Sequence, residues 1–176
     1  IDDSKKYYRL SGGRFNPAMG KLIAAWGFHA SEKPDHPLIE KIKSNMPGMD
    51  HLLVENGEAS STNPYLQLDF GAIAKGLAVR QIAELLIEHN TQNFIINAGG
   101  DVFAHGNKQD RQWRVGIEDP FQPGVIATMA LASGQSIFTS GDYQRYHVDE
   151  NNRRSHHIID PKTGEPSAYV SAATIV

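Results

Sequence analysis

Residues 69–76 (Asp-Phe-Gly-Ala-Ile-Ala-Lys-Gly) constrain the fold of this chain more than any other stretch. A short apolar run at 65–68 precedes them, and apolar residues with helical spacing follow them to about His89. We therefore predict a strand over 66–70 that turns directly into a long amphipathic helix, with its apolar face at Ala74, Ala78, Ile82, Leu85 and Leu86. Such a turn brings backbone N–H groups and a helix N-terminus to a point where a phosphate can bind.

Composition narrows the class of protein. The 176 residues are 40% hydrophobic and 21% charged, as expected of one soluble globular domain. A formal net charge of −3 without any Lys/Arg run argues against nucleic-acid binding, and no apolar stretch approaches the ~20 residues that cross a bilayer. The absence of Cys excludes disulfides, thiolate metal sites and cysteine nucleophiles. Because the chain begins with Ile and closes on a strand pattern, we expect a fragment of a longer protein.

The remaining pattern predicts one long helix among many short strands. Shorter helices are predicted at 18–26 and 37–45, and Asn56-Gly57 predicts a hairpin between strands at 52–55 and 58–61. Further strands are predicted at 93–97, 102–105, 113–117, 125–132, 136–139, 158–159 and 171–176. About three helices and seven or eight short strands in this order favour an α+β fold with a mixed or mostly antiparallel sheet.

Two interpretations of Asp69 and Lys75 stay open. Asp69 stands where a helix begins, so its carboxylate either caps early N–H groups or binds a polar ligand. Lys75 either supplies positive charge to that ligand or is a solvated helix residue. The segment lacks the glycine and lysine spacing of a P-loop and of a dinucleotide fingerprint, so the residues alone indicate only a nucleotide-like ligand.

Three downstream segments add to this signal. A double glycine within 97–101 (Asn-Ala-Gly-Gly-Asp) indicates either a plain bulge or a close approach of ligand atoms to the backbone. Hydroxyls and a glycine at 139–143 (Thr-Ser-Gly-Asp-Tyr) suit an oxyanion or nucleotide, or simply a turn. In the segment 156–164, neighbouring imidazoles on a strand point to opposite faces, so at most one of them faces any given pocket, where it serves either as an acid or base or in a hydrogen-bonded structural role.

These segments, in this order, resemble the ApbE family, the FAD:protein FMN transferases, from about residue 13 to residue 176. The resemblance rests on Phe-Asn-Pro at 15–17, Trp-Gly-Phe at 26–28, the segment 69–76, Asn-Ala-Gly-Gly-Asp at 97–101, Trp-Arg-Val-Gly-Ile at 113–117, Thr-Ser-Gly-Asp-Tyr at 139–143, and His-Ile-Ile-Asp-Pro-Lys-Thr-Gly at 157–164. It implies a single ApbE-like α+β domain over 1–176. It also implies an enzyme that uses FAD and Mg²⁺, joins FMN through its phosphate to a Thr or Ser hydroxyl of an acceptor flavoprotein, and releases AMP.

The resemblance also implies roles for individual residues. His157 is expected beside the reacting phosphates as the catalytic residue, and the backbone carbonyl of Ala72 as a Mg²⁺ ligand. The residues expected to bind FAD are Phe15, Asn16, Asp69, Lys75, Thr139, Ser140, Gly141 and Ile158. The resemblance further suggests a bacterial lipoprotein of the periplasm or cell envelope, although this chain carries no targeting segment.

Two departures from the family pattern leave other functions open. Asn16 stands where the family usually has Asp, and the family continues into a segment whose Asp and Thr complete the metal site. A flavin-contacting stretch of the family also precedes residue 1. The alternatives are therefore hydrolysis of FAD to FMN and AMP, and FAD binding without catalysis.

Overall fold

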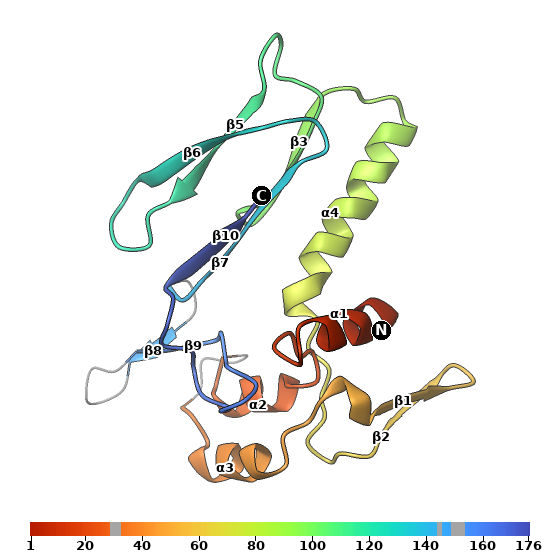
Figure 1. Ribbon diagram of the computed structural model, residues 1–176, viewed down its shortest axis with the longest axis vertical. Helices are drawn as coiled ribbons and strands as arrows, with labels where there is room; N and C mark the ends of the chain where they lie inside the picture. The colour runs from red at the N-terminus through yellow and green to blue at the C-terminus, as the bar shows by residue number, and fades with distance from the viewer. Residues whose placement is uncertain (29–32, 144–145, 149–153) are drawn as a thin grey trace. The chain divides into compact units, whose positions relative to one another are not determined.

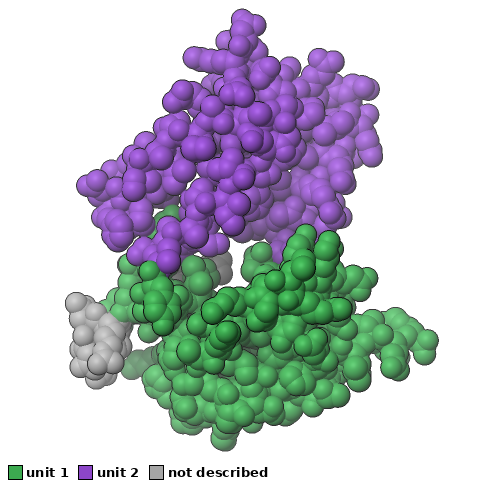
Figure 2. All heavy atoms as spheres, viewed as in Figure 1, with its two compact units in different colours: residues 1–72, 142–169 green, residues 73–141, 170–176 purple. Residues whose placement is uncertain are grey.

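The computed structural model describes residues 1–28, 33–143, 146–148 and 154–176. Within them the chain divides into two compact units, coloured separately in Figure 2. Unit 1 comprises residues 1–72 and 142–169, and unit 2 comprises residues 73–141 and 170–176. Each unit has an apolar core of its own. The expectation of one domain over residues 1–176 stays a prediction.

Unit 1 contains the short helices α1 (Asp2–Leu10), α2 (Gly20–Ala25) and α3 (His36–Ser44), and the 3₁₀ helix η1 (Met49–His51) (Figure 1). The predicted helices at 18–26 and 37–45 are confirmed as α2 and α3. The Asp35 side chain caps α3 by accepting a 3.0 Å hydrogen bond from the Leu38 N–H. The helix α1 was not predicted, although Asp2 and Asp3 in its first turn suit a helix N-terminus.

Two hairpins and an apolar core complete unit 1. Strands β1 (Leu52–Glu55) and β2 (Glu58–Ser61) pair antiparallel across Asn56-Gly57, whose φ angles of 52° and 81° are those of the predicted tight turn. Strands β8 (Tyr146–Val148) and β9 (Arg154–His156) also pair antiparallel. The main core lies between α2, α3 and the chain after β9, and its buried residues are Met19, Leu22, Ala25, Trp26, Ile39, Ile42 and Ile159.

The predicted strands at 66–70 and 158–159 are wrong. Residues 66–70 run extended beside the entrance to α2, where Gly20 N–H donates to the Gln67 carbonyl at 2.8 Å. Only one bridge forms, between Met19 and Gln67, because the partner segment turns into α2 at Gly20. Residues 158–159 likewise form a single bridge, between Ile159 and Pro166.

Unit 2 holds the long helix α4 (Gly71–Glu88), apart from its first two residues, and a four-stranded antiparallel sheet in the order β10-β7-β4-β3 (Figure 1). These strands are β3 (Phe94–Ala98), β4 (Asp101–His105), β7 (Ser136–Gly141) and β10 (Ala172–Ile175), and a separate hairpin pairs β5 (Trp113–Glu118) with β6 (Val125–Leu131). The core joins the sheet to this hairpin through the buried residues Val102, Ala104, Leu131 and Ile137. The α+β class with antiparallel sheets is confirmed, with four α-helices in the described residues instead of about three.

The face that α4 buries differs from the predicted one. Its buried residues are Val79 and Ala83, while Ile82 and Leu85 are 46% and 54% exposed. A Cβ placed on Gly76 would lie 3.9 Å from the Phe138 ring of β7, so this part of α4 faces the sheet at ordinary contact distance. No helix among the described residues is long and apolar enough to cross a membrane.

Candidate functional site

The entrance to α4 places Asp69 in a capping position in unit 1. Its Oδ1 accepts a 2.7 Å hydrogen bond from the Gly71 N–H, and its own N–H donates to the Pro17 carbonyl at 2.8 Å. A Cβ on Gly71 would lie 3.0 Å from the same Oδ1, so glycine suits this close turn. The capping contact is confirmed, and the role of Asp69 as a ligand stays a prediction.

The side chain of Asn16 makes two structural contacts. Its Oδ1 accepts from the Ala18 N–H at 3.2 Å, and its Nδ2 donates to the Pro47 carbonyl at 2.8 Å. A carboxylate at this position would lack the donor for Pro47, which gives the asparagine a local reason. The half-buried Phe15 ring packs edge-on against Tyr7, with centroids 6.3 Å apart. Flavin contact by Phe15 and Asn16 stays a prediction.

His156 is the structural member of the histidine pair. It is 5% exposed, its Nε2 lies 2.5 Å from the Ser167 carbonyl, and its Nδ1 lies 3.3 Å from the Ile158 backbone nitrogen. A carbonyl only accepts and an N–H only donates, so these contacts assign the Nε2 proton to the bond with Ser167 and leave Nδ1 as the acceptor from Ile158. These two bonds fix the backbone on either side of His157, which is half-buried.

The turn after Ile159 folds around Asp160. The Asp160 carbonyl accepts from the N–H groups of Thr163 and Gly164 at 3.2 and 2.8 Å, and its Oδ1 accepts from the Lys162 N–H at 2.9 Å. Its Oδ2 lies 3.7 Å from the Arg14 guanidinium. This ion pair brings the turn beside the residues that precede Phe15.

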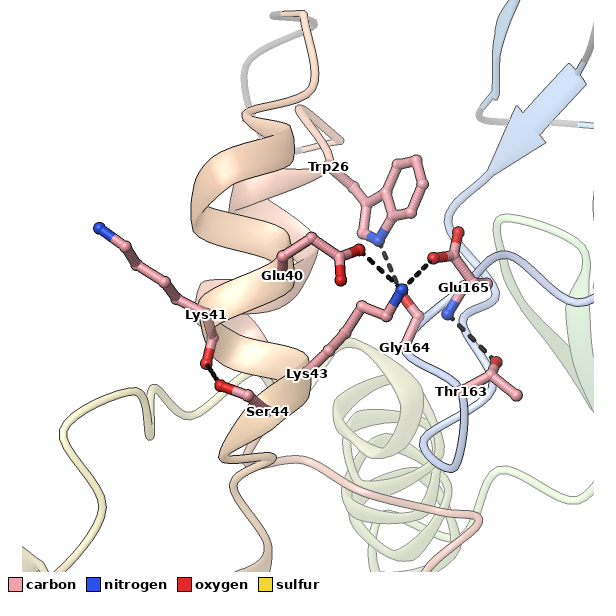
Figure 3. Close-up of polar contacts among 8 residues, drawn as sticks. All are labelled: Trp26, Glu40, Lys41, Lys43, Ser44, Thr163, Gly164 and Glu165. Atoms are coloured by element: carbon pink, nitrogen blue, oxygen red, sulfur yellow. Dashed lines mark hydrogen bonds and ion pairs between the residues drawn. The ribbon is translucent and has the colours of Figure 1, made fainter.

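Two side chains from α3 and the end of α2 hold this turn in place (Figure 3). The buried Trp26 Nε1–H donates to the Gly164 carbonyl at 3.0 Å. The Lys43 ammonium lies 2.6 Å from Glu165 and 2.8 Å from Glu40, and hydrogen bonding to these carboxylates, Glu165 first, raises the Lys43 pKa. Gly164 has a φ of 72°, and a Cβ there would lie 2.5 Å from Lys43 Cγ.

In unit 2, Lys75 is ion-paired with a buried acid. Its half-exposed ammonium contacts the carboxylate of Asp101, which is 4% exposed. Lys75 is therefore not simply a solvated helix residue, and its proposed contact with FAD stays a prediction. Sequence reasoning assigned Asp101 no site role; the double glycine before it was the available signal.

Thr139 on β7 contacts both Asp101 and the neighbouring strand β10. Its backbone N–H donates to Asp101 Oδ1 at 3.2 Å, and its hydroxyl lies 2.9 Å from that of Thr174 on β10. Ser140 is exposed, and Gly141 ends β7 opposite Ala172. Thr139 thus joins β4, β7 and β10.

A hollow of about 340 Å³ adjoins Thr139 in unit 2. It lies between the β5–β6 hairpin and strands β7 and β10, and its lining consists of Ile117, Glu118, Pro120, Phe121, Ile126, Thr139, Ser171, Ala172 and Thr174. Apolar walls with three hydroxyls and one carboxylate suit a planar group with polar edges. Among the predicted site residues, Thr139 is the one in this lining.

The described residues supply only part of the oxygen ligands that a bound metal needs. Ala72 lies exposed in the first turn of α4, and its carbonyl is a single oxygen ligand. Across the described ranges, no three His, Asp or Glu side chains group together in a way that could hold a metal. Mg²⁺ favours six oxygen ligands, so these residues do not fit a protein-only Mg²⁺ site.

Three of the predicted segments meet within unit 1. Asp69 bonds to Pro17 and Asp160 pairs with Arg14, so the stretch 14–17 contacts both the entrance of α4 and the turn after Ile159. His157 and Ile158 belong to the same unit. Lys75, Thr139, Ser140 and Gly141 belong to unit 2, where Asp101 links the first two.

Comparison with known proteins gives consistent matches. The model of the ApbE family matches residues 1–176. The FAD:protein FMN transferase of Rhodobacter capsulatus is 38% identical over 170 residues, covering 94% of this chain and 32% of that protein. The protein of the same name from Treponema pallidum is 34% identical, covering 89% and 48%. The chain thus spans about half, or less, of these curated relatives.

The chain is also similar in structure to solved proteins of the ApbE family. The ApbE protein from Thermotoga maritima MSB8 superimposes with a TM-score of 0.87 at 30% identity, covering 98% of this chain and 57% of that one. The flavin transferase ApbE from Vibrio cholerae gives 0.80 at 27% identity, covering 98% and 56%.

Proposed function

Because the chain belongs to the ApbE family, we propose that it acts in FAD:protein FMN transfer, moving FMN from FAD to a Thr or Ser hydroxyl of an acceptor flavoprotein. The names of its curated relatives support this reaction. The observation that carries the proposal is the meeting of three motif segments at residues 14–17, since Asp69 and Asp160 both contact this stretch. Chain segments so distant in sequence converge here around the residues expected to bind the flavin.

The proposed reaction exchanges the phosphoanhydride linkage between the FMN and AMP halves of FAD for a phosphate ester of the acceptor hydroxyl. The acceptor hydroxyl oxygen attacks the FMN phosphorus, the P–O bond to the AMP half breaks, and AMP leaves with the bridging oxygen. His157 takes the hydroxyl proton, which requires a positioned imidazole. The two backbone bonds of His156 provide that positioning for the segment.

Further residues of the chain have binding roles in this proposal. Asp69 and Lys75 contact FAD, Phe15 and Ile158 border the flavin, and Thr139 lines a hollow able to hold a planar group. We also propose that Mg²⁺ assists, since a divalent ion neutralises pyrophosphate oxygens. Because one carbonyl at Ala72 is too few ligands, the ion would need the oxygens of FAD and of groups outside the described residues.

A second candidate is FAD binding without transfer. Both ends of the Asn16 amide make backbone contacts, and Asn16 offers no carboxylate to a metal or flavin. Hydrolysis of FAD by water at the same site is the third outcome. The three differ in their products and are separable in one assay.

The test combines the chain with FAD, Mg²⁺ and an acceptor flavoprotein domain, followed by mass spectrometry of the acceptor and measurement of AMP. Transfer adds one FMN to the acceptor and releases one AMP. AMP without a mass change indicates hydrolysis, and FAD binding without AMP indicates a binding protein. Either result contradicts the transferase proposal.

His157→Ala is the matched variant for this assay. We expect transfer to slow by about 10²- to 10⁴-fold while FAD still binds, because the variant loses the proton acceptor. His89→Ala, at an exposed position just after α4, is the control and should transfer at the wild-type rate. Unchanged turnover in His157→Ala would remove this residue from the mechanism.

We also propose a periplasmic or cell-envelope location, which fractionation of cells expressing the parent gene tests.

A further inference from the structure

A buried carboxylate links two of the proposed FAD-binding residues in unit 2. Asp101 is 4% exposed, and both of its oxygens are engaged. Oδ2 contacts the Lys75 ammonium, and Oδ1 accepts from the Thr139 N–H at 3.2 Å. A buried carboxylate is stable only with such partners, so these contacts account for its burial.

The local sequence places Asp101 at this point. Gly99 and Gly100 form a two-residue turn between β3 and β4, and Ala98 pairs with Asp101 directly across it. Both glycines have positive φ, 66° and 95°, as a tight hairpin turn of this kind requires. Asn97 Oδ1 accepts from the Gly100 N–H at 2.8 Å and stabilises the turn.

The contacts of Asp101 extend to three other elements. Lys75 lies in the second turn of α4, Thr139 lies on β7, and the Thr139 hydroxyl bonds to Thr174 on β10. Asp101 therefore connects the segments 69–76, 97–101 and 139–143 at one buried group.

We propose that Asp101 is a positioning residue for the FAD-binding groups of unit 2, an inference that rests on the proposed function. It holds Lys75 in one orientation, and the remaining N–H donors of the ammonium then face an anionic ligand oxygen such as that of a diphosphate. It also fixes the backbone of β7 at Thr139, from which Ser140 and Gly141 follow. Asp101 itself does not touch the reacting atoms.

A purely structural role makes a different prediction from a positioning role. If Asp101 only stabilises the sheet, its variants unfold more easily but bind FAD normally once folded. If it positions Lys75, the ordering of that long side chain is completed before the ligand arrives. Without Asp101, FAD binding must order Lys75, and this cost corresponds to a loss of about tenfold in affinity.

The experiment is a double-mutant cycle on FAD affinity in the full chain, with Asp101→Asn and Lys75→Met. Asparagine keeps an oxygen for the Thr139 N–H and loses the charge, and methionine keeps an apolar stem without the ammonium. We expect each single variant to raise the FAD Kd about tenfold. We expect the Kd of the double variant to be raised by no more than about tenfold as well. In Asp101→Asn, KM for FAD should rise while kcat at saturating FAD stays near wild type.

Controls separate this inference from the proposed function. Asp110→Asn, in the exposed loop between β4 and β5, should leave the FAD Kd unchanged. Circular dichroism of each variant verifies that the affinity refers to folded protein. Additive losses of about a hundredfold, an unchanged Kd in Asp101→Asn, or tighter binding by a released Lys75 charge would each overturn the positioning role while leaving the transferase proposal intact. A wild-type chain that binds no FAD would overturn both.

Discussion

Gly164→Ala tests how the turn after Ile159 is held in unit 1. Gly164 is buried and has a φ of 72°, and the methyl carbon of an alanine there would lie 2.5 Å from Lys43 Cγ. Alanine therefore meets two separate penalties at this position. It must adopt a left-handed backbone, and it must displace the Lys43 side chain from its two carboxylate partners.

The size of each penalty follows from the structure. A left-handed conformation costs a non-glycine residue about 1 to 2 kcal/mol. Displacing Lys43 weakens its contacts with Glu165 and Glu40, which are partly solvated and contribute at most about 1 kcal/mol each. We therefore expect Gly164→Ala to lower the free energy of unfolding by about 2 to 3 kcal/mol.

Gly57→Ala provides a matched control in the same unit. Gly57 has a φ of 81°, but no atom lies within 4 Å of the added Cβ, so this variant meets the backbone penalty alone. We expect a loss of about 1 kcal/mol. Denaturant unfolding followed by Trp26 fluorescence, in a Trp113→Phe background, reports on the unit that contains both glycines. Equal losses in the two variants would refute the steric argument at Gly164.

Three further predictions concern unit 1. His156→Ala leaves a partly buried carbonyl and a backbone N–H without their partner, so denaturant unfolding should show a loss of about 2 to 4 kcal/mol; a loss below about 1 kcal/mol would contradict the two bonds. Asp69→Asn keeps an oxygen for the Gly71 N–H, so it should weaken FAD binding in a titration while the melting temperature holds; a collapse in melting temperature with normal affinity would make Asp69 only a cap. The raised Lys43 pKa stabilises the folded chain fully below the usual value of 10.5, and this contribution is lost as the pH rises through the raised pKa. The stability difference between wild type and Lys43→Met should therefore shrink at high pH, and a difference independent of pH would contradict the ion pair with Glu165.

Local chemistry allowed some elements to be predicted from the sequence. Asn56-Gly57 specifies its hairpin because both residues tolerate positive φ. The helix α3 follows from a proline near its start and from apolar residues one turn apart. The strand predicted at 66–70 fails because a strand needs a partner of matching length, and its neighbour becomes α2 after one bridge. Pairing of this kind depends on distant residues.

The buried face of α4 illustrates a second limit. Apolar residues lie on nearly every side of this helix, and the exposed ones include Leu77, Ile82, Leu85 and Ile87. The sequence pattern then contains several possible apolar faces. The structure buries Val79 and Ala83, whose smaller side chains permit closer packing. Packing geometry, which one sequence does not contain, decides between these faces.

The site residues show the same division between local and distant information. The adjacency of His156 and His157 suffices to predict that at most one of them faces any given pocket, and the contacts of His156 with Ser167 and Ile158 give that residue a structural role. The pairing of Lys75 with Asp101 was not predictable, because 17 basic and 20 acidic residues offer many possible ion pairs. A glycine pair before an acid indicates a tight turn, yet the partner of that acid depends on how α4 and β4 approach each other. Since Asp101 contacts both Lys75 and Thr139, changes at these residues should affect FAD binding non-additively, and the double-mutant cycle with Asp101→Asn and Lys75→Met measures that coupling.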